Sequence, residues 1–243
     1  MKGFGPAPTI YDLDPYTDSS VQMHPLGARG ETGDGRKFRY CKAVAATVAG
    51  DCYGSAGQNS QFQSMAVSTA GAAIGATQIS VTNGTTTVAA NDFDEGLLMV
   101  SYGTGIGQSG TILSHTTGGS GATIVYTIDT PLAVAITAAS SKVTVIKNPF
   151  DDVIIQAVTP VAPAVGIAPA VIATGYFGWI QTGGPCAALW DASVAAVDTL
   201  GVSPSTTTAG CVTVATTGFE VIGFAMQVVP VSAYVCPVFL TID

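Results

Sequence analysis

Residues 78–88 read Gln-Ile-Ser-Val-Thr-Asn-Gly-Thr-Thr-Thr-Val, two alternating segments on either side of an Asn-Gly pair. The β-branched residues Ile, Val and Thr suit a pleated strand better than a helix. An Asn-Gly pair between alternating segments is a strong signal for a hairpin turn. The stretch therefore predicts a β-hairpin with strands at 78–82 and 85–88.

The same signature recurs on both sides of this hairpin. Upstream, a Gly-Asp-Gly turn at 33–35 precedes an alternating segment, 36–45, which predicts the first strand. Downstream, short apolar segments bounded by Gly, Asn or Pro predict further strands. These are residues 97–102, 110–114, 123–128, 142–146, 153–158, 175–182, 186–189, 211–215, 219–229 and 235–242. The only helical candidates are weak, at 131–139 and 191–198. The sequence predicts an all-β protein with an antiparallel β-sandwich or barrel-like body.

Changes in composition divide the chain into four segments. Residues 1–27 hold four prolines and show no periodicity, which predicts an extended N-terminal arm that orders against a neighbouring molecule. Residues 28–66 contain the first hairpin and a polar linker, and residues 67–149 form a β-rich insertion module. Residues 150–243 form a C-terminal β domain, with pairing to residues 28–66 as an open alternative.

Charged side chains are scarce in this protein. They make up 10% of the residues, hydrophobic residues make up 47%, and the mean hydropathy is +0.44. Soluble domains usually carry about 25% charged residues. This composition argues against disorder and indicates that another molecule covers part of the surface. Prolines interrupt the longest apolar stretches, and the N-terminus lacks an apolar leader. We therefore expect no membrane span and no signal peptide.

The few charges are unevenly placed. Five of the eight basic residues lie between Arg29 and Lys42, and no Lys, Arg or His follows Lys147. A net charge of −8 argues against a nucleic-acid partner, because phosphate binding requires clustered cations. The basic cluster has two compatible interpretations. It is a polar hairpin in which cations alternate with inward-facing Phe38 and Tyr40, or it is a contact patch for an acidic partner surface.

The residue types that carry catalysis or metal binding lack supporting motifs. The glycines at 103–110 match a loose dinucleotide-binding spacing, but a predicted strand follows them where that motif requires a helix. His24 and His115 have no nucleophile motif around them. The acidic groups at 92–95 and 151–152 are typical of loops rather than a glycosidase pair or a calcium loop. The five cysteines have no close pairs, so we expect reduced, buried thiols, with one disulfide as an open alternative. We expect no enzyme activity, no cofactor and no metal site.

Residues 175–187, GYFGWIQTGGPCA, are the most distinctive local sequence. Alternation places Phe177 and Trp179 on one face of a strand and Tyr176 on the other. Such a strand is buried on both sides or lies at an interface. We therefore assign Tyr176, Phe177 and Trp179 to a core or to a self-association surface, with a ligand platform as the alternative.

Four stretches of this chain, in the same order, resemble one family of virion proteins. They are residues 35–43 (GRKFRYCKA), 103–110 (GTGIGQSG), 140–150 (SSKVTVIKNPF) and 176–185 (YFGWIQTGGP). They are similar to the decoration, or cement, proteins of tailed bacteriophages, which are encoded near the major capsid protein. Cys41 and Cys186 depart from the family's pattern, in which small or apolar residues are expected.

The resemblance implies a structural protein that decorates and stabilises the capsid exterior, in a virion assembled in the host cytoplasm. It also implies a β-rich body, a homotrimer and an arm that reaches neighbouring subunits. Because no cation follows Lys147, we expect the principal self-association surface in the C-terminal half. The alternatives are a tail, fibre or neck protein, and a carbohydrate-binding module that uses Tyr176, Trp179 and Trp190. The residues assigned to contact with the major capsid protein are Phe4, Tyr11, Tyr16, Arg36, Lys37 and Arg39.

Overall fold

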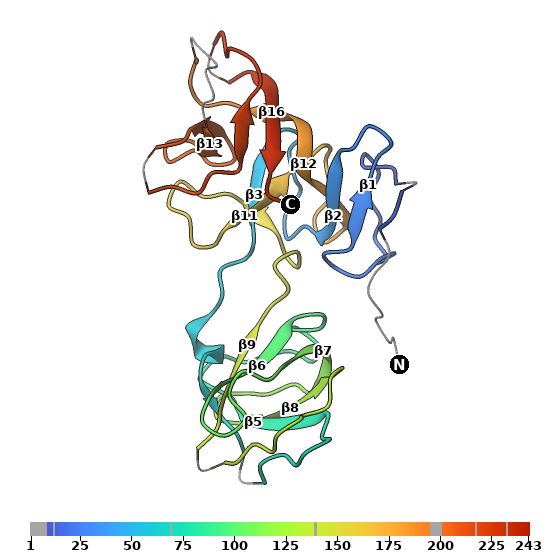
Figure 1. Ribbon diagram of the computed structural model, residues 1–243, viewed down its shortest axis with the longest axis vertical. Coiled ribbons are helices and arrows are strands. Elements are labelled where there is room, and N and C mark those ends of the chain that lie inside the picture. The colour runs from blue at the N-terminus through green and yellow to red at the C-terminus, as the bar shows by residue number, and fades with distance from the viewer. Residues whose placement is uncertain are drawn as a thin grey trace. The chain divides into compact units, whose positions relative to one another are not determined.

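The computed structural model describes residues 9–11, 13–68, 70–138, 140–194, 201–216, 218–231 and 233–243. The protein is all-β with antiparallel sheets, which confirms the predicted fold class. The described residues form two compact units (Figure 1). Unit 1 is Gln58–Asn148, and unit 2 combines the described residues before Gln58 with Pro149–Asp243.

Unit 1 is a six-stranded antiparallel sheet with the strand order β4-β9-β6-β7-β8-β5. A bridge between Val67 and Val81 joins the two ends of this sheet, and the Ser68 N–H donates to the Ser80 carbonyl at 2.8 Å. The sheet is thereby nearly closed into a barrel, which leaves few unpaired strand edges. Its strands are β4 (Met65–Ala66), β5 (Gln78–Thr82), β6 (Leu97–Tyr102), β7 (Ser109–His115), β8 (Thr123–Ile128) and β9 (Lys142–Ile146).

Alternation along these strands builds the barrel core. In β5, Ile79 and Val81 are fully buried, as the period of two predicts. The core also includes Phe62, which ends the short 3₁₀ helix η1 (Ser60–Phe62), and Met65 of β4. Because these two side chains pack inside the barrel, unit 1 begins at Gln58 and not at the predicted residue 67.

Two predicted elements of unit 1 are wrong. Residues 85–88 form a loop rather than a strand, because the Asn83 side-chain amide donates to the carbonyls of Thr86 and Gly119 at 2.7 and 2.9 Å. These bonds hold the chain away from a tight hairpin. The described part of the predicted helix 131–139 is also irregular, because Ile136 exchanges backbone hydrogen bonds with Ala72 instead of forming helical ones.

Unit 2 is a ten-stranded sheet in which strands from both ends of the sequence pair with each other. The main path is β10-β3-β11-β12-β16-β15-β13-β14, and β2 pairs with both β1 and β12. The strands are β1 (Arg29–Glu31), β2 (Lys37–Lys42), β3 (Cys52–Gly54), β10 (Ile154–Ile155), β11 (Ala164–Ile167), β12 (Phe177–Leu189), β13 (Gly201–Pro204), β14 (Val212–Val214), β15 (Gly223–Ala225) and β16 (Val235–Thr241).

The long strand β12 organises this sheet. Its first half pairs with β2 and its second half with β16, and both partners meet at Gly183. The sequence predicts a break at Gly-Gly-Pro, but β12 continues through it. The Gln181 side-chain amide donates to the carbonyls of Gly183 and Pro185 at 3.1 and 2.7 Å, and these bonds hold the irregular segment within the strand.

Other predicted elements of unit 2 are shorter than expected. The predicted strand 153–158 is reduced to β10, because its partner β3 has only three residues. The predicted strands 211–215 and 219–229 are reduced to β14 and β15, which pair with β13 over three and two residues. Within the predicted helix 191–198, Val194 exchanges backbone hydrogen bonds with Val229, so residues 191–194 are not helical. Residues 195–198 lie outside the described part.

All five cysteines are free and buried. Burial raises the pKa of the Cys41 and Cys186 thiols to about 12, so both stay protonated and unreactive at neutral pH. No helix in the described part of the chain has the length and apolar character needed to span a membrane.

Candidate functional site

The described part of the N-terminal arm lies on unit 2 of its own chain. Ile10 donates to the Arg29 carbonyl at 2.9 Å and accepts from the Glu31 N–H at 2.8 Å, and Ser19 and Phe177 exchange two backbone bonds. The prediction that the arm orders against a neighbour is wrong for these residues. The reason is that the side chains of Ile10, Leu13 and Leu26 cover an apolar cluster of the same chain. Phe4, which was assigned to partner contact, lies outside the described residues.

The cluster beneath the arm is aromatic. Trp179 is only 5% exposed, and its ring centroid lies 5.1 Å from that of Tyr40 and 5.5 Å from that of His24. The Tyr40 hydroxyl accepts from the Met23 N–H at 3.0 Å, which ties the arm to β2. Phe177 is partly buried and stacks on Tyr40. Trp179 and Phe177 therefore belong to the core beneath the arm.

The opposite face of the same strand is buried as well. Ile180 belongs to a second apolar cluster, so β12 is covered on both sides at Trp179 and Ile180, which is one of the two alternatives that the sequence predicts. Tyr176 precedes the strand and is 38% exposed. Trp190 is fully buried. Neither tryptophan offers a ring face on which a sugar could stack, so only Tyr176 remains exposed of the three residues assigned to the carbohydrate-binding alternative.

The basic cluster forms the hairpin β1–β2, with Phe38 and Tyr40 facing the core as predicted. Arg39 makes a bidentate ion pair with Asp243, with nitrogen to oxygen distances of 2.5 and 2.6 Å. A third bond runs from Arg39 to the Gly27 carbonyl at 2.9 Å. This arginine therefore joins β2 to the segment after β16 and serves the fold rather than a free contact surface.

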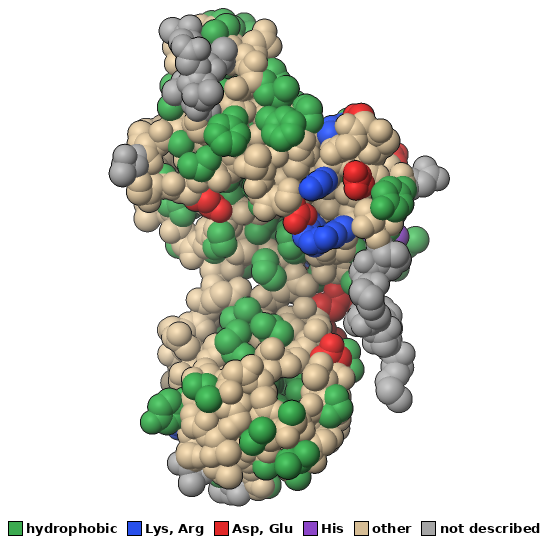
Figure 2. All heavy atoms as spheres, viewed as in Figure 1, with side chains coloured by type: hydrophobic (Ala, Val, Ile, Leu, Met, Phe, Trp, Pro, Cys, Tyr) green, Lys and Arg blue, Asp and Glu red, His purple; other side chains and the backbone are tan. Residues whose placement is uncertain are grey.

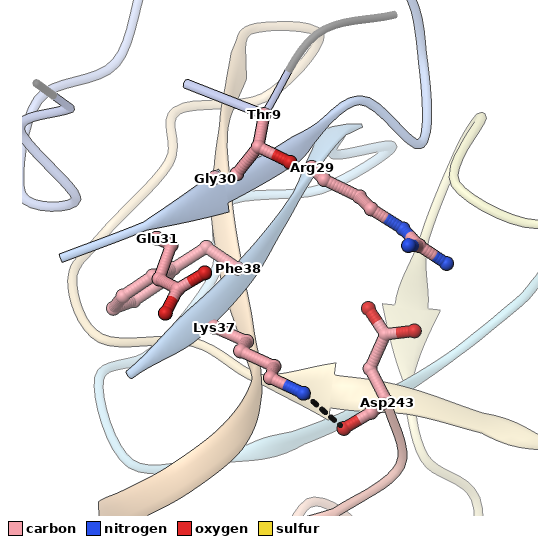
Figure 3. A pocket seen from close by; sticks show the side chains of 7 residues that line it. All are labelled: Thr9, Arg29, Gly30, Glu31, Lys37, Phe38 and Asp243. Carbon is pink, nitrogen blue, oxygen red and sulfur yellow. Dashed lines mark hydrogen bonds between the residues drawn. The ribbon is translucent and has the colours of Figure 1, made fainter. Parts of the chain in front are cut away.

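A pocket of about 220 Å³ lies beside this ion pair. In Figure 3 the side chains of Arg29 and Lys37 extend from the hairpin on the same side as Asp243, and Lys37 reaches the Asp243 carbonyl at 3.5 Å. The hydrogen bond from Arg39, with smaller effects of Arg29 and Lys37, holds the pKa of Asp243 below its ordinary value. The lining residues are Thr9, Arg29, Gly30, Glu31, Lys37, Phe38 and Asp243.

The remaining predicted contact residues lie away from that pocket. Arg36 donates to Asp34 at 2.8 Å and to the Tyr16 hydroxyl at 3.4 Å. Tyr16 is 58% exposed and Tyr11 is 73% exposed. Arg36 and Tyr16 line a separate groove of about 240 Å³ that includes Pro185 of β12. The structure thus places Lys37 in the pocket beside Asp243 and Arg36 and Tyr16 in the groove, whereas Tyr11 lines neither.

Two exposed aromatic residues near the end of the chain were not among the residues predicted for self-association. Phe224 and Phe239 lie opposite each other on β15 and β16 and are 46% and 44% exposed. A signal for this surface was present, because residues 235–240 are apolar at every position and alternation alone buries only half of them.

In unit 1, the acidic loop at 92–95 lies beside a buried histidine. The Nε2 atom of His115 accepts from the Phe93 N–H at 2.9 Å, and Nδ1 lies 3.0 Å from the Thr116 carbonyl, which assigns the proton of the neutral ring to Nδ1. Burial lowers the pKa of His115 below its ordinary 6.5. Burial, with a smaller effect of Glu95, raises the pKa of Asp94 to about 6. Among the described residues, no cluster of His, Cys, Asp or Glu could hold a metal ion.

These shifts predict opposing effects of pH on the stability of unit 1. The folded state favours neutral His115. The contribution of this residue to the stability of unit 1 is therefore complete above pH 6.5 and is lost as the pH falls below that value. Asp94 acts in the other direction. Its pKa is raised by burial, so protonation removes a buried charge and unit 1 gains stability as the pH falls through about 6. His115→Gln removes the first effect and keeps the second.

We therefore expect the stability advantage of the wild type over His115→Gln to shrink between pH 7 and pH 5. This difference in stability is measured by urea denaturation with amide hydrogen exchange in the barrel strands as the readout. An advantage that stays constant across this range would contradict a neutral, buried His115.

Comparisons with protein families, curated proteins and solved structures found no match to this chain. The class of this protein therefore has to be inferred from its residues and geometry.

Proposed function

We propose that this chain is a structural virion protein that decorates and stabilises the outer surface of a tailed-phage capsid. It would bind the lattice of the major capsid protein as an oligomer, which the family resemblance implies to be a trimer. One observation supports this proposal above the others. The four stretches that carry the resemblance lie in contacting pairs within the two units.

In unit 2, the stretch 35–43 contains β2, which pairs along the stretch 176–185 in β12. In unit 1, the stretch 103–110 begins at Gly103, whose Cα packs against the backbone of Ser140, the first residue of 140–150. Residues that are far apart in sequence thus form one contact in each unit. This arrangement supports a resemblance at the level of the fold, because unrelated local similarities would have no reason to meet.

The surface of unit 2 suits a protein that makes many weak contacts. The pocket beside Asp243 presents the cations Arg29 and Lys37, and the described arm exposes Tyr11 and Tyr16. A cation pair of this kind fits an acidic side chain on the coat protein, and exposed tyrosines provide amphipathic contacts. Repeated over a lattice, such contacts bind the assembled shell in preference to loose subunits and so stabilise it.

The proposal predicts that the purified protein binds undecorated phage capsids and raises the temperature at which they disrupt. The double variant Arg29→Glu with Lys37→Glu should bind at least about tenfold more weakly, and the difference should narrow at high salt. Co-sedimentation with capsids measures binding, and calorimetry measures shell stability. Lys142→Glu, which reverses a cation of unit 1, is the matched control and should bind as the wild type does.

Failure of the wild type to bind capsids at every salt concentration would remove this proposal. Binding to purified tails, without a stoichiometric coat on heads, would instead favour the alternative of a tail, fibre or neck protein.

A further inference from the structure

The sheet formed by β12, β15 and β16 is apolar on both of its faces. One face packs into the core of unit 2, with Val238 and Leu240 of β16 fully buried. Antiparallel sheets that have one face in solvent usually alternate apolar and polar residues. Here the second face is apolar too, which is unusual for a surface in contact with water.

The outward face follows directly from the strand register. On β16, Val235, Pro237 and Phe239 alternate with the buried residues. Phe239 lies between Phe224 of β15 and Pro185 of β12. Figure 2 shows hydrophobic side chains gathered over β15 and β16. We call this surface the outer sheet face; it consists of Pro185, Ala187, Phe224, Met226, Val235, Pro237 and Phe239.

A groove continues from this face. Its volume is about 240 Å³, and Pro185, Ala187 and Val235 form part of its wall. Because Phe239 pairs with Pro185 in the sheet, two projecting aromatic rings and a groove lie next to each other on one surface. A projection beside a recess is the shape that lets one surface pack against another copy of itself.

Charge indicates which partner fits. The outer sheet face carries no charged side chain, and Arg36 is the one charged residue among those that line the adjoining groove. No Lys, Arg or His follows Lys147. The only acidic residues after residue 201 are Glu220, which accepts from the Ala164 N–H at 2.9 Å, and Asp243, which is paired with Arg39. With a net charge of −8, two copies repel each other wherever their acidic surfaces meet. A neutral, apolar face is where they can approach closely.

We propose that the outer sheet face is the surface through which copies of this chain assemble, with Phe224 and Phe239 of one copy buried against another copy. This inference deepens the proposed function by naming the surface of the oligomer. It rests on the oligomeric part of that proposal and not on capsid binding.

The test uses the double variant Phe224→Thr with Phe239→Thr, which keeps β-forming residues on both strands. Light scattering and sedimentation at micromolar concentration should give the wild type the mass of an oligomer, at least twice the 24.4 kDa of one chain. The variant should sediment as a single chain, with a dissociation constant raised at least about 100-fold, because buried aromatic anchors dominate such interfaces. Val235→Lys, which places a charge on the same face, should have the same effect.

The matched control is Tyr102→Thr with Ile106→Thr, which removes two exposed side chains from unit 1, 64% and 65% exposed, and should leave the mass unchanged. Unchanged tryptophan emission establishes that the variants of the outer sheet face are folded, since both tryptophans lie in unit 2. Amide hydrogen exchange in β6 and β7 reports on the folding of the control, whose substitutions lie in unit 1. A monomeric wild type, or a double variant that still assembles, would overturn the inference. A monomeric wild type whose capsid binding is lost in the double variant would overturn self-association and leave the capsid proposal standing.

Discussion

Replacing Trp179 by alanine should lower the free energy of unfolding of unit 2 by about 3–5 kcal/mol, the usual loss when a large buried aromatic is truncated. The indole is 5% exposed and packs on Tyr40 and His24. The arm side chains Ile10 and Leu13 lie over the same cluster. The cavity left by the indole removes the surface on which the arm rests, so the arm should also become sensitive to protease.

Denaturation followed by the emission of Trp190 measures this loss, because Trp190 is buried elsewhere in unit 2 and remains as the reporter. Tyr176→Ala is the matched control. It truncates an aromatic residue three positions earlier that is 38% exposed, and it should cost about 0.5 kcal/mol or less. If Trp179→Ala does not fold, Trp179→Phe keeps the test available with a smaller loss. A loss below about 1 kcal/mol for the alanine variant would contradict a packed core beneath the arm.

Gly103→Ala should destabilise unit 1 by about 2–5 kcal/mol, the sum of a backbone cost and a steric one. Gly103 has a φ of 77°, which disfavours any residue with a Cβ by about 1–2 kcal/mol. A Cβ at this position would also collide with the Ser140 carbonyl oxygen, so the loop must move away from Ser140. Displacement of a packed segment adds about 1–3 kcal/mol.

Gly107→Ala separates the two costs. Gly107 has a φ of 89°, but no atom lies within 4 Å of the position that a Cβ would occupy there, so this variant carries the backbone strain without the collision. It should cost only about 1–2 kcal/mol. Hydrogen exchange of the β6 and β9 amides measures both variants, while tryptophan emission reports on unit 2. Equal losses for the two variants would show that the contact with Ser140 contributes nothing.

These two sites matter for the proposed function because each lies where two of the resembling stretches meet. Trp179 pairs with Tyr40 between β12 and β2, and Gly103 contacts Ser140 in unit 1. Trp179 stabilises the fold by packing its side chain, and Gly103 does so because it has no Cβ that would collide with Ser140. The surfaces proposed for contact with other molecules lie elsewhere on unit 2, beside Asp243 and on the outer sheet face.

The residue pattern was sufficient to predict four strands of unit 1, although β5 pairs with the distant β8 and β6 with the distant β9. The predicted bounds of β5, β6, β8 and β9 are those of the structure, because alternating β-branched residues and flanking turns are local properties. The burial of Trp179 and of Phe38 could also be predicted, since alternation assigns each side chain to a face.

The candidate site could be predicted only in part. Arg29, Lys37 and Arg39 were recognisable as a basic cluster, but nothing in the sequence indicates that Arg39 is bound to Asp243, 204 positions away. The contact of the arm with its own chain could not be predicted either, because the arm has too few apolar residues to show a periodic pattern. Its contact with Trp179 depends on β1 and β2 being present to receive it.

By itself, then, the sequence determined that this is an all-β protein with little charge and with apolar strands near its end. Alternation and composition are sufficient for those properties, because both are read from neighbouring residues. Only the tertiary structure decided that β12 continues through Gly-Gly-Pro, that the arm covers Trp179 and that Phe224 and Phe239 share an exposed face. Each of these depends on which distant strand supplies the hydrogen bonds, and that choice is made by the packing of the whole unit.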